Sequence, residues 1–108
     1  MISEVDVRKF IAAHADGAHV LDVREPHEYE AGHVPGARLV PLSTVPYVAH
    51  QLPMGLPIYV ICQSGDRSRV AAQHLAQIGH DVRAVIGGTS SWINAGRPVV
   101  RGLRANIA

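Results

Sequence analysis

The chain has 108 residues, of which 47% are hydrophobic, and ten basic against nine acidic residues give a formal net charge of +1. This length fits one domain with its own core, spanning residues 1–108, and it equally fits one domain of a longer protein. The lone cysteine excludes an internal disulfide. The mixed charges and the few aromatic residues argue against nucleic-acid binding. No apolar run approaches the roughly 20 residues of a membrane span. No signal-peptide pattern opens the sequence, so we expect a cytoplasmic protein.

The predicted elements alternate between helices and strands. Ser3 and Asp6 fit a capping box that begins a helix, with Asp in place of the usual Glu, and Gly17 fits its end. Short apolar runs with β-branched residues indicate strands, and Pro-Gly pairs mark turns. Up to residue 50, these patterns predict a helix at 3–17, a strand at 19–23, a short helix at 25–29, a weak strand at 37–41 and a helix at 43–50.

The clearest strand covers residues 57–62, which are apolar except for the Tyr59 hydroxyl. Such a run is typical of a strand buried on both faces of a parallel sheet. Residues 62–67 are predicted as a loop, and residues 68–78 as a helix whose apolar face contains Val70, Leu75 and Ile78. A strand at 81–86, a helix at 89–94 and an extended tail from Pro98 follow.

This alternation predicts an α/β fold with a mainly parallel sheet and helices on both faces. In such sheets ligands bind beyond the carboxyl ends of the strands. Cys62 lies at that end of the strand 57–62. The segment that follows Cys62 is therefore the expected place of a functional site.

The segment after the clearest strand has the features of an anion-binding loop. A tight loop that leads into a helix can aim several backbone N–H groups at one centre, and the helix dipole adds positive charge there. Gly65 permits an unusual backbone angle, and Arg67 adds a permanent positive charge. A cysteine facing these groups should ionise easily and act as a nucleophile. The candidate site is Cys62 as nucleophile, with Arg67 and the backbone N–H groups of Gln63, Ser64, Gly65, Asp66 and Ser68 as the binding groups.

Each residue of the loop has a simpler structural interpretation when it is taken alone. Cys62 could be packing material, Ser68 a helix cap, Arg67 a surface charge and Gly65 a turn residue. The pattern Cys-x-x-Gly-x-Arg-Ser between a strand and a helix favours a functional loop.

At these residues the chain resembles the rhodanese-like family. Three stretches carry the resemblance, in the order of the family: residues 21–37, the loop 62–68 and residues 87–98, and together they span about residues 20–98. The resemblance implies a five-stranded, mostly parallel sheet flanked by helices. It implies a sulfurtransferase in which Cys62 carries sulfur as a persulfide, while Arg67 and the loop N–H groups bind the anionic substrate. Donors would be thiosulfate, a persulfide or a polysulfide, and acceptors would be cyanide, thiols or proteins, without a cofactor or metal.

One position departs from the pattern of some members of this family. Asp66 stands where a neutral or basic residue is common. Its carboxylate would weaken the attraction for a dianionic donor such as thiosulfate, and Arg69 would offset that effect.

Several other polar residues are predicted to be structural. Asp22 and Arg24 should fix the turn after the first predicted strand, and His33 should support the backbone of its His-Val-Pro-Gly segment. Trp92 should anchor the core. His27 and His33 are six positions apart, so one helical face cannot present both to zinc as a metalloprotease motif does.

Three alternatives compete with sulfur transfer. A cysteine phosphatase or arsenate reductase of related fold usually has a wider loop, whereas only four residues separate Cys62 from Arg67. A silent binding module would not need both of these residues. A thiol redox enzyme usually has a second cysteine, which this chain lacks. The sequence is compatible with either a monomer or a homodimer.

Overall fold

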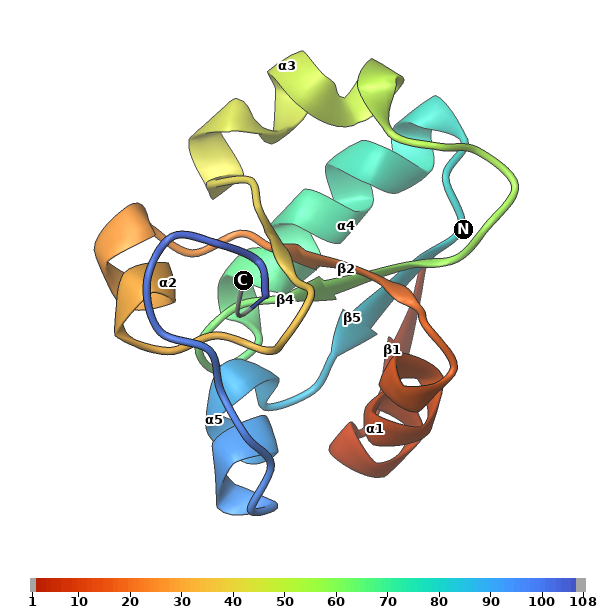
Figure 1. Cartoon of the computed structure of the whole chain (residues 1–108). Helices are drawn as coiled ribbons and strands as arrows, with labels where there is room; N and C mark the ends of the chain where they lie inside the picture. The colour runs from red at the N-terminus through yellow and green to blue at the C-terminus, as the bar shows by residue number, and fades with distance from the viewer. Residues whose placement is uncertain (1, 107–108) are drawn as a thin grey trace.

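A five-stranded parallel sheet forms the centre of the computed structural model, which describes residues 2–106 (Figure 1). The strands lie in the order β1-β5-β4-β2-β3, and every neighbouring pair is parallel. This confirms the predicted fold class. The strand bounds are β1 Ile2–Val5, β2 His19–Asp22, β3 Arg38–Leu39, β4 Ile58–Ile61 and β5 Val82–Val85.

Helices cover both faces of this sheet. Figure 1 shows α3 and α4 on one side and α1 and α5 on the other. Two 3-10 turns flank α3, so the single helix predicted at 43–50 is in fact three short pieces. The helix bounds are α1 Val7–Ala15, α2 Pro26–Ala31, α3 Val45–Val48, α4 Asp66–Ile78 and α5 Gly88–Asn94, and the 3-10 turns are η1 Leu42–Thr44 and η2 Ala49–Gln51.

The central strand β4 contributes side chains to both halves of the core. Ile58 and Val60 belong to the apolar cluster beneath α3 and α4, whereas Tyr59 and Ile61 belong to the cluster with Trp92 of α5. Successive side chains of a strand point to opposite faces, so a strand covered on both sides is apolar throughout. Trp92 is fully buried, as predicted.

The prediction of a helix beginning at Ser3 was wrong. Residues Ile2–Val5 form the edge strand β1, which pairs with β5, and Asp6 is the residue that caps α1, where it accepts a hydrogen bond from the Lys9 N–H at 2.9 Å. The side chains of β1 are mostly exposed. A short edge strand of this kind has no apolar alternation, so its existence depends on pairing with a strand about 80 positions later.

Two details of the longest helix also differ from the prediction. Helix α4 begins at Asp66, so Arg67 lies in its first turn and not in the preceding loop. Val70 is 45% exposed and does not face the sheet. The buried face instead has the helical spacing of Ser68, Ala71, Ala72 and Leu75.

Candidate functional site

Cys62 follows the last residue of β4 and lies at the carboxyl edge of the sheet. It is 1% exposed. The chain curls around its sulfur, and the N–H of Gly65 donates a hydrogen bond to Sγ at 3.0 Å. Gly65 has a φ of +120°, the left-handed conformation that glycine was predicted to supply there. The loop therefore turns its backbone amides inward, toward the sulfur.

The hydroxyl of Ser68 is the side-chain partner of this sulfur. Its Oγ lies 3.6 Å from Sγ of Cys62 and donates a hydrogen bond to the carbonyl oxygen of Gly65 at 2.9 Å. Ser68 is fully buried in the first turn of α4. A hydroxyl has one proton and can rotate, so it can accept from the neutral thiol and donate to the thiolate. The sequence indicated only the backbone of Ser68, and its side chain is a further contributor.

Competing effects act on the acidity of the thiol. Burial raises the pKa of Cys62, but hydrogen bonds from the Ser68 side chain and from the backbone of Ser68, Gly65 and Ser64 together lower this pKa below its ordinary value. Donors aimed at an anion favour its charged form. The buried sulfur is thus kept in an environment that favours the thiolate.

Arg67 forms an ion pair that the sequence did not reveal. Its two terminal nitrogens donate to the two carboxylate oxygens of Glu28 at 2.6 and 2.8 Å. The hydrogen bond from Arg67 is the main reason that the pKa of Glu28 is lowered to about 2, and the same contact raises the pKa of Arg67. An anion that binds Arg67 must therefore compete with Glu28, which lies on α2, 39 positions earlier in the chain.

Asp66 points away from the centre of the loop. Its carboxylate is 89% exposed and lies 3.3 Å from Arg69, which also contacts Glu4 at 2.9 Å. Arg69 thus contacts Asp66, the residue whose charge it was expected to offset.

Arg24 connects the turn after β2 to the cysteine loop. It contacts the buried carboxylate of Asp22 at 2.9 Å and donates to the carbonyl oxygen of Gly32 at 2.9 Å. Another of its nitrogens donates to the Gln63 side chain at 2.9 Å, and the amide of Gln63 donates to Ser90 Oγ at 2.8 Å. Gln63 therefore ties the loop to α5 through its side chain as well as through its backbone.

The Gly87-Gly88 pair brings α5 against the back of the loop. The N–H groups of Thr89 and Ser90 donate to the carbonyl oxygens of Cys62 and Gln63 at 2.8 and 3.1 Å. A Cβ atom at Gly88 would collide with the Cys62 carbonyl oxygen, and the φ of Gly88 is +55°. The start of the stretch 87–98 therefore packs directly against the cysteine loop, and a glycine at position 88 makes this close approach possible.

His33 is buried and lies among backbone carbonyl groups. Its two ring nitrogens are each 2.8 Å from a carbonyl oxygen, one of Tyr29 and one of Arg104. The ring also stacks on Tyr29 with centroids 3.5 Å apart. These contacts join α2 to the C-terminal segment and fit the structural role expected from the sequence.

Residues 2–106 contain no group of three or more His, Cys, Asp or Glu side chains arranged to hold a metal ion. No helix in the same range is long and apolar enough to cross a membrane.

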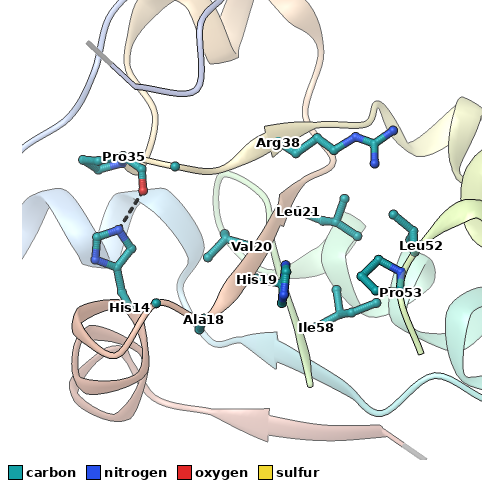
Figure 2. A pocket seen from close by; sticks show the side chains of 12 residues that line it. His14, Ala18, His19, Val20, Leu21, Pro35, Arg38, Leu52, Pro53 and Ile58 are labelled. Carbon is teal, nitrogen blue, oxygen red and sulfur yellow. Dashed lines mark hydrogen bonds between the residues drawn. The ribbon is translucent and has the colours of Figure 1, made fainter. Parts of the chain in front are cut away.

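Two hollows of the surface lie at opposite edges of the sheet. One, of about 510 Å³, reaches the cysteine loop at Gln63 and is bounded by α2 and the C-terminal segment. The other, of about 380 Å³, lies at the amino ends of β2 and β4, the opposite edge of the sheet from Cys62 (Figure 2). In that hollow His14 contacts the carbonyl oxygen of Pro35 at 2.7 Å.

The comparisons with known proteins agree with this fold. Among solved structures, a rhodanese-related protein of Thermoplasma volcanium is 32% identical, with a TM-score of 0.86 over 94% of this chain and 99% of that one. A thiosulfate sulfurtransferase of Pseudomonas aeruginosa is 27% identical, with a TM-score of 0.83 over 97% of this chain and 21% of that one.

Two curated relatives come from Bacillus subtilis, and both are 40% identical to this chain. The match to YqhL covers 69% of this chain and 60% of YqhL. The match to YrkF, whose name proposes a sulfur carrier protein, covers 71% of this chain and 42% of YrkF. The chain thus spans less than two thirds of these relatives. Residues 6–95 match the family described as the rhodanese-like domain, and the chain belongs to that family.

Proposed function

We propose that the protein is a sulfurtransferase in which Cys62 carries one sulfane sulfur as a persulfide. The observation that supports this most directly is the surroundings of Sγ: the Gly65 N–H donates to it at 3.0 Å, and the Ser68 hydroxyl, 3.6 Å away, can rotate to donate to the thiolate. Donors that are already in place stabilise charge without reorganisation during the reaction. Membership of the rhodanese-like family supports a role in sulfur transfer at the level of the family.

The proposed reaction is a double displacement. The Cys62 thiolate attacks the outer sulfur of thiosulfate, the S–S bond of the donor breaks, and sulfite leaves with the bonding electron pair. The sulfur remains on Cys62 as an anionic persulfide, which the same amides would stabilise. An acceptor nucleophile then attacks this sulfur and releases the thiolate.

The donor could be thiosulfate, a persulfide or a polysulfide, and the acceptor a thiol, a protein or cyanide. The Pseudomonas aeruginosa structure is that of a thiosulfate sulfurtransferase, which supports the first donor. The name of YrkF supports sulfur carriage, and hence a protein or thiol acceptor. Because the Asp66 carboxylate points outward, it should repel a dianionic donor at the loop less than the sequence suggested.

We further propose that residues 1–108 form one such domain, as a monomer or homodimer, in the cytoplasm. The location is proposed because a lone reactive thiol is best maintained in a reducing compartment. Arg67 would assist anion binding from the first turn of α4, in exchange with its partner Glu28.

Intact-mass spectrometry after incubation with thiosulfate, and separately with polysulfide, tests the proposal. The protein should gain the mass of one sulfur atom and lose it on treatment with cyanide. Because Cys62 is the only cysteine, Cys62→Ser should gain nothing. A parent protein that loads from neither donor, or a serine variant that loads as well as the parent, would contradict the assignment. Thermal unfolding of both proteins checks that the variant is folded.

A further inference from the structure

We propose that the hollow beside Gln63 selects acceptor thiols that carry anionic groups, and that Arg97 and Arg101 recognise them. The inference rests on the proposed function and adds to it a class of acceptor. The hollow has a volume of about 510 Å³, within the range of sites for small organic molecules. The charged and polar residues that line it are Arg24, His27, Glu28, Gln63, Arg97 and Arg101.

The hollow adjoins the reactive loop at two points. Gln63, the residue after Cys62, lines it directly and is held in place by Arg24 and Ser90. Glu28 also lines it and binds Arg67 at the other end of the loop. A molecule seated in the hollow therefore lies against the loop that surrounds the sulfur.

Positive charge remains in the hollow after the ion pairs are assigned. Arg24 is neutralised by Asp22, and Glu28 is neutralised by Arg67. Arg97 and Arg101 form no ion pair with any carboxylate among residues 2–106. Two arginines without an acidic partner favour a ligand that supplies carboxylate or phosphate oxygens.

A side-chain contact positions Arg97, and backbone hydrogen bonds hold the segment that carries Arg101. Arg97 lies over the ring of Trp92, with 5.7 Å between the guanidinium carbon and the ring centre. Both neighbours of Arg101 form backbone hydrogen bonds. Val100 pairs with His33 through two bonds of 2.9 Å, and the Gly102 N–H donates to the carbonyl oxygen of Glu30 at 2.8 Å. In Figure 1 this C-terminal segment runs beside α2. The wall of the hollow is therefore built by ordered backbone.

The shape of the hollow points to the acceptor, not to a small inorganic donor. The hollow outside the cysteine loop has a volume of about 510 Å³ and also has apolar walls from Ala31, Ile93 and Val99, whereas thiosulfate is a small inorganic anion without an apolar part. An acceptor with a short carbon chain and carboxylate groups satisfies both kinds of wall. The anionic Cys62 persulfide first takes a proton from solvent to become Cys–S–SH, and the acceptor thiolate then attacks its outer sulfur. The persulfide S–S bond breaks, Cys62 leaves as thiolate with the electron pair, and the acceptor becomes R–S–SH.

Discharge of the loaded protein by three thiols tests this selection. The probes are mercaptosuccinate with two carboxylates, neutral 2-mercaptoethanol and cationic cysteamine. The quantity compared is the ratio of the mercaptosuccinate rate to the mercaptoethanol rate. At low salt this ratio should be about tenfold higher in the parent protein than in the double variant Arg97→Gln/Arg101→Gln, as electrostatic steering allows. Added salt should reduce the parent's advantage. Arg8→Gln removes one positive charge from the exposed surface of α1 and should leave the ratio unchanged.

A second measurement needs no persulfide and so separates this inference from the proposed function. Unloaded Cys62 is alkylated with anionic iodoacetate and with neutral iodoacetamide. The iodoacetate-to-iodoacetamide rate ratio should fall severalfold in the double variant and not in Arg8→Gln. If Cys62 fails to load sulfur but this ratio falls, the proposed function fails and the anion-selective hollow stands. If the ratios of the parent and the double variant are equal in this assay, the inference about the hollow is overturned.

Discussion

Arg67 and Glu28 form a bidentate ion pair beside the cysteine loop, with nitrogen–oxygen distances of 2.6 and 2.8 Å. The positive charge that was predicted to receive the substrate anion is thus already matched by a carboxylate. Substrate binding must weaken this pair or share it. The pair makes Glu28 a determinant of how strongly the loop attracts anions.

We expect Glu28→Gln to accelerate sulfur loading from thiosulfate, because the variant leaves the Arg67 charge uncompensated beside the loop. The gain should be on the order of tenfold at low ionic strength and should shrink with salt. Mass-resolved loading kinetics measure it. Glu30→Gln removes a charge from an exposed position of the same helix and serves as the control. A slower loading of Glu28→Gln would show that the ion pair positions Arg67 for catalysis.

The same ion pair predicts a pH-dependent part of the stability. The pKa of Glu28 is lowered in the folded protein from 4.5 to about 2, so the folded state favours the carboxylate. This contribution is complete above about pH 4.5 and is lost as the pH falls toward about 2. In urea unfolding across this window, the stability advantage of the parent over Glu28→Gln should shrink as the pH falls. A difference that is constant with pH would contradict the linkage.

Ser68→Ala should raise the pKa of Cys62, because the variant removes the only side chain that is hydrogen-bonded to the sulfur among residues 2–106. Alkylation by iodoacetamide at neutral pH should become severalfold slower, since less thiolate is present. The rate followed across pH reports the shift directly. Ser64→Ala is the matched control, because Ser64 is exposed and contributes through its backbone. Equal pH profiles for Ser68→Ala and the parent would refute a role for the hydroxyl.

Gly88→Ala should destabilise the fold and impair loading, because its methyl group would push against the Cys62 carbonyl. Gly96→Ala isolates the cost of the backbone conformation, since Gly96 has a φ of +77° with nothing near its missing Cβ. A left-handed non-glycine residue costs about 1–3 kcal/mol, and the collision at Gly88 should add to this. Urea unfolding compares the two variants. Equal losses in both would show that the loop can shift to accommodate the methyl group.

The size of the loop predicts negligible hydrolysis of aryl phosphates. With four residues between Cys62 and Arg67, the amides converge on the sulfur, and a phosphoryl group would be displaced from them. Misplacement by about 1 Å can lower a rate about a hundredfold. Phosphatase activity as fast as sulfur transfer, abolished by Cys62→Ser, would restore the phosphatase alternative. Insertion of one glycine after Ser64 should reduce sulfur transfer.

The sequence by itself determined the α/β class, the position of Cys62 at the end of the central strand and the left-handed turn at Gly65. Each of these follows from a local pattern. The apolar run at residues 57–62 predicts a strand buried on both faces, and a glycine between a strand and a helix indicates a positive φ. The three stretches of family resemblance then supplied the expectation of a fifth strand, which alternation alone did not place.

Only the tertiary structure decided which distant groups meet at the loop. Strand β1 forms because β5 offers it a hydrogen-bonding edge, and its exposed side chains carry no local signal. Glu28 meets Arg67 because the fold brings this side chain of α2 to the first turn of α4, although 39 positions separate the two residues. Such pairings depend on the packing of whole elements against the sheet, and no spacing within the sequence encodes them.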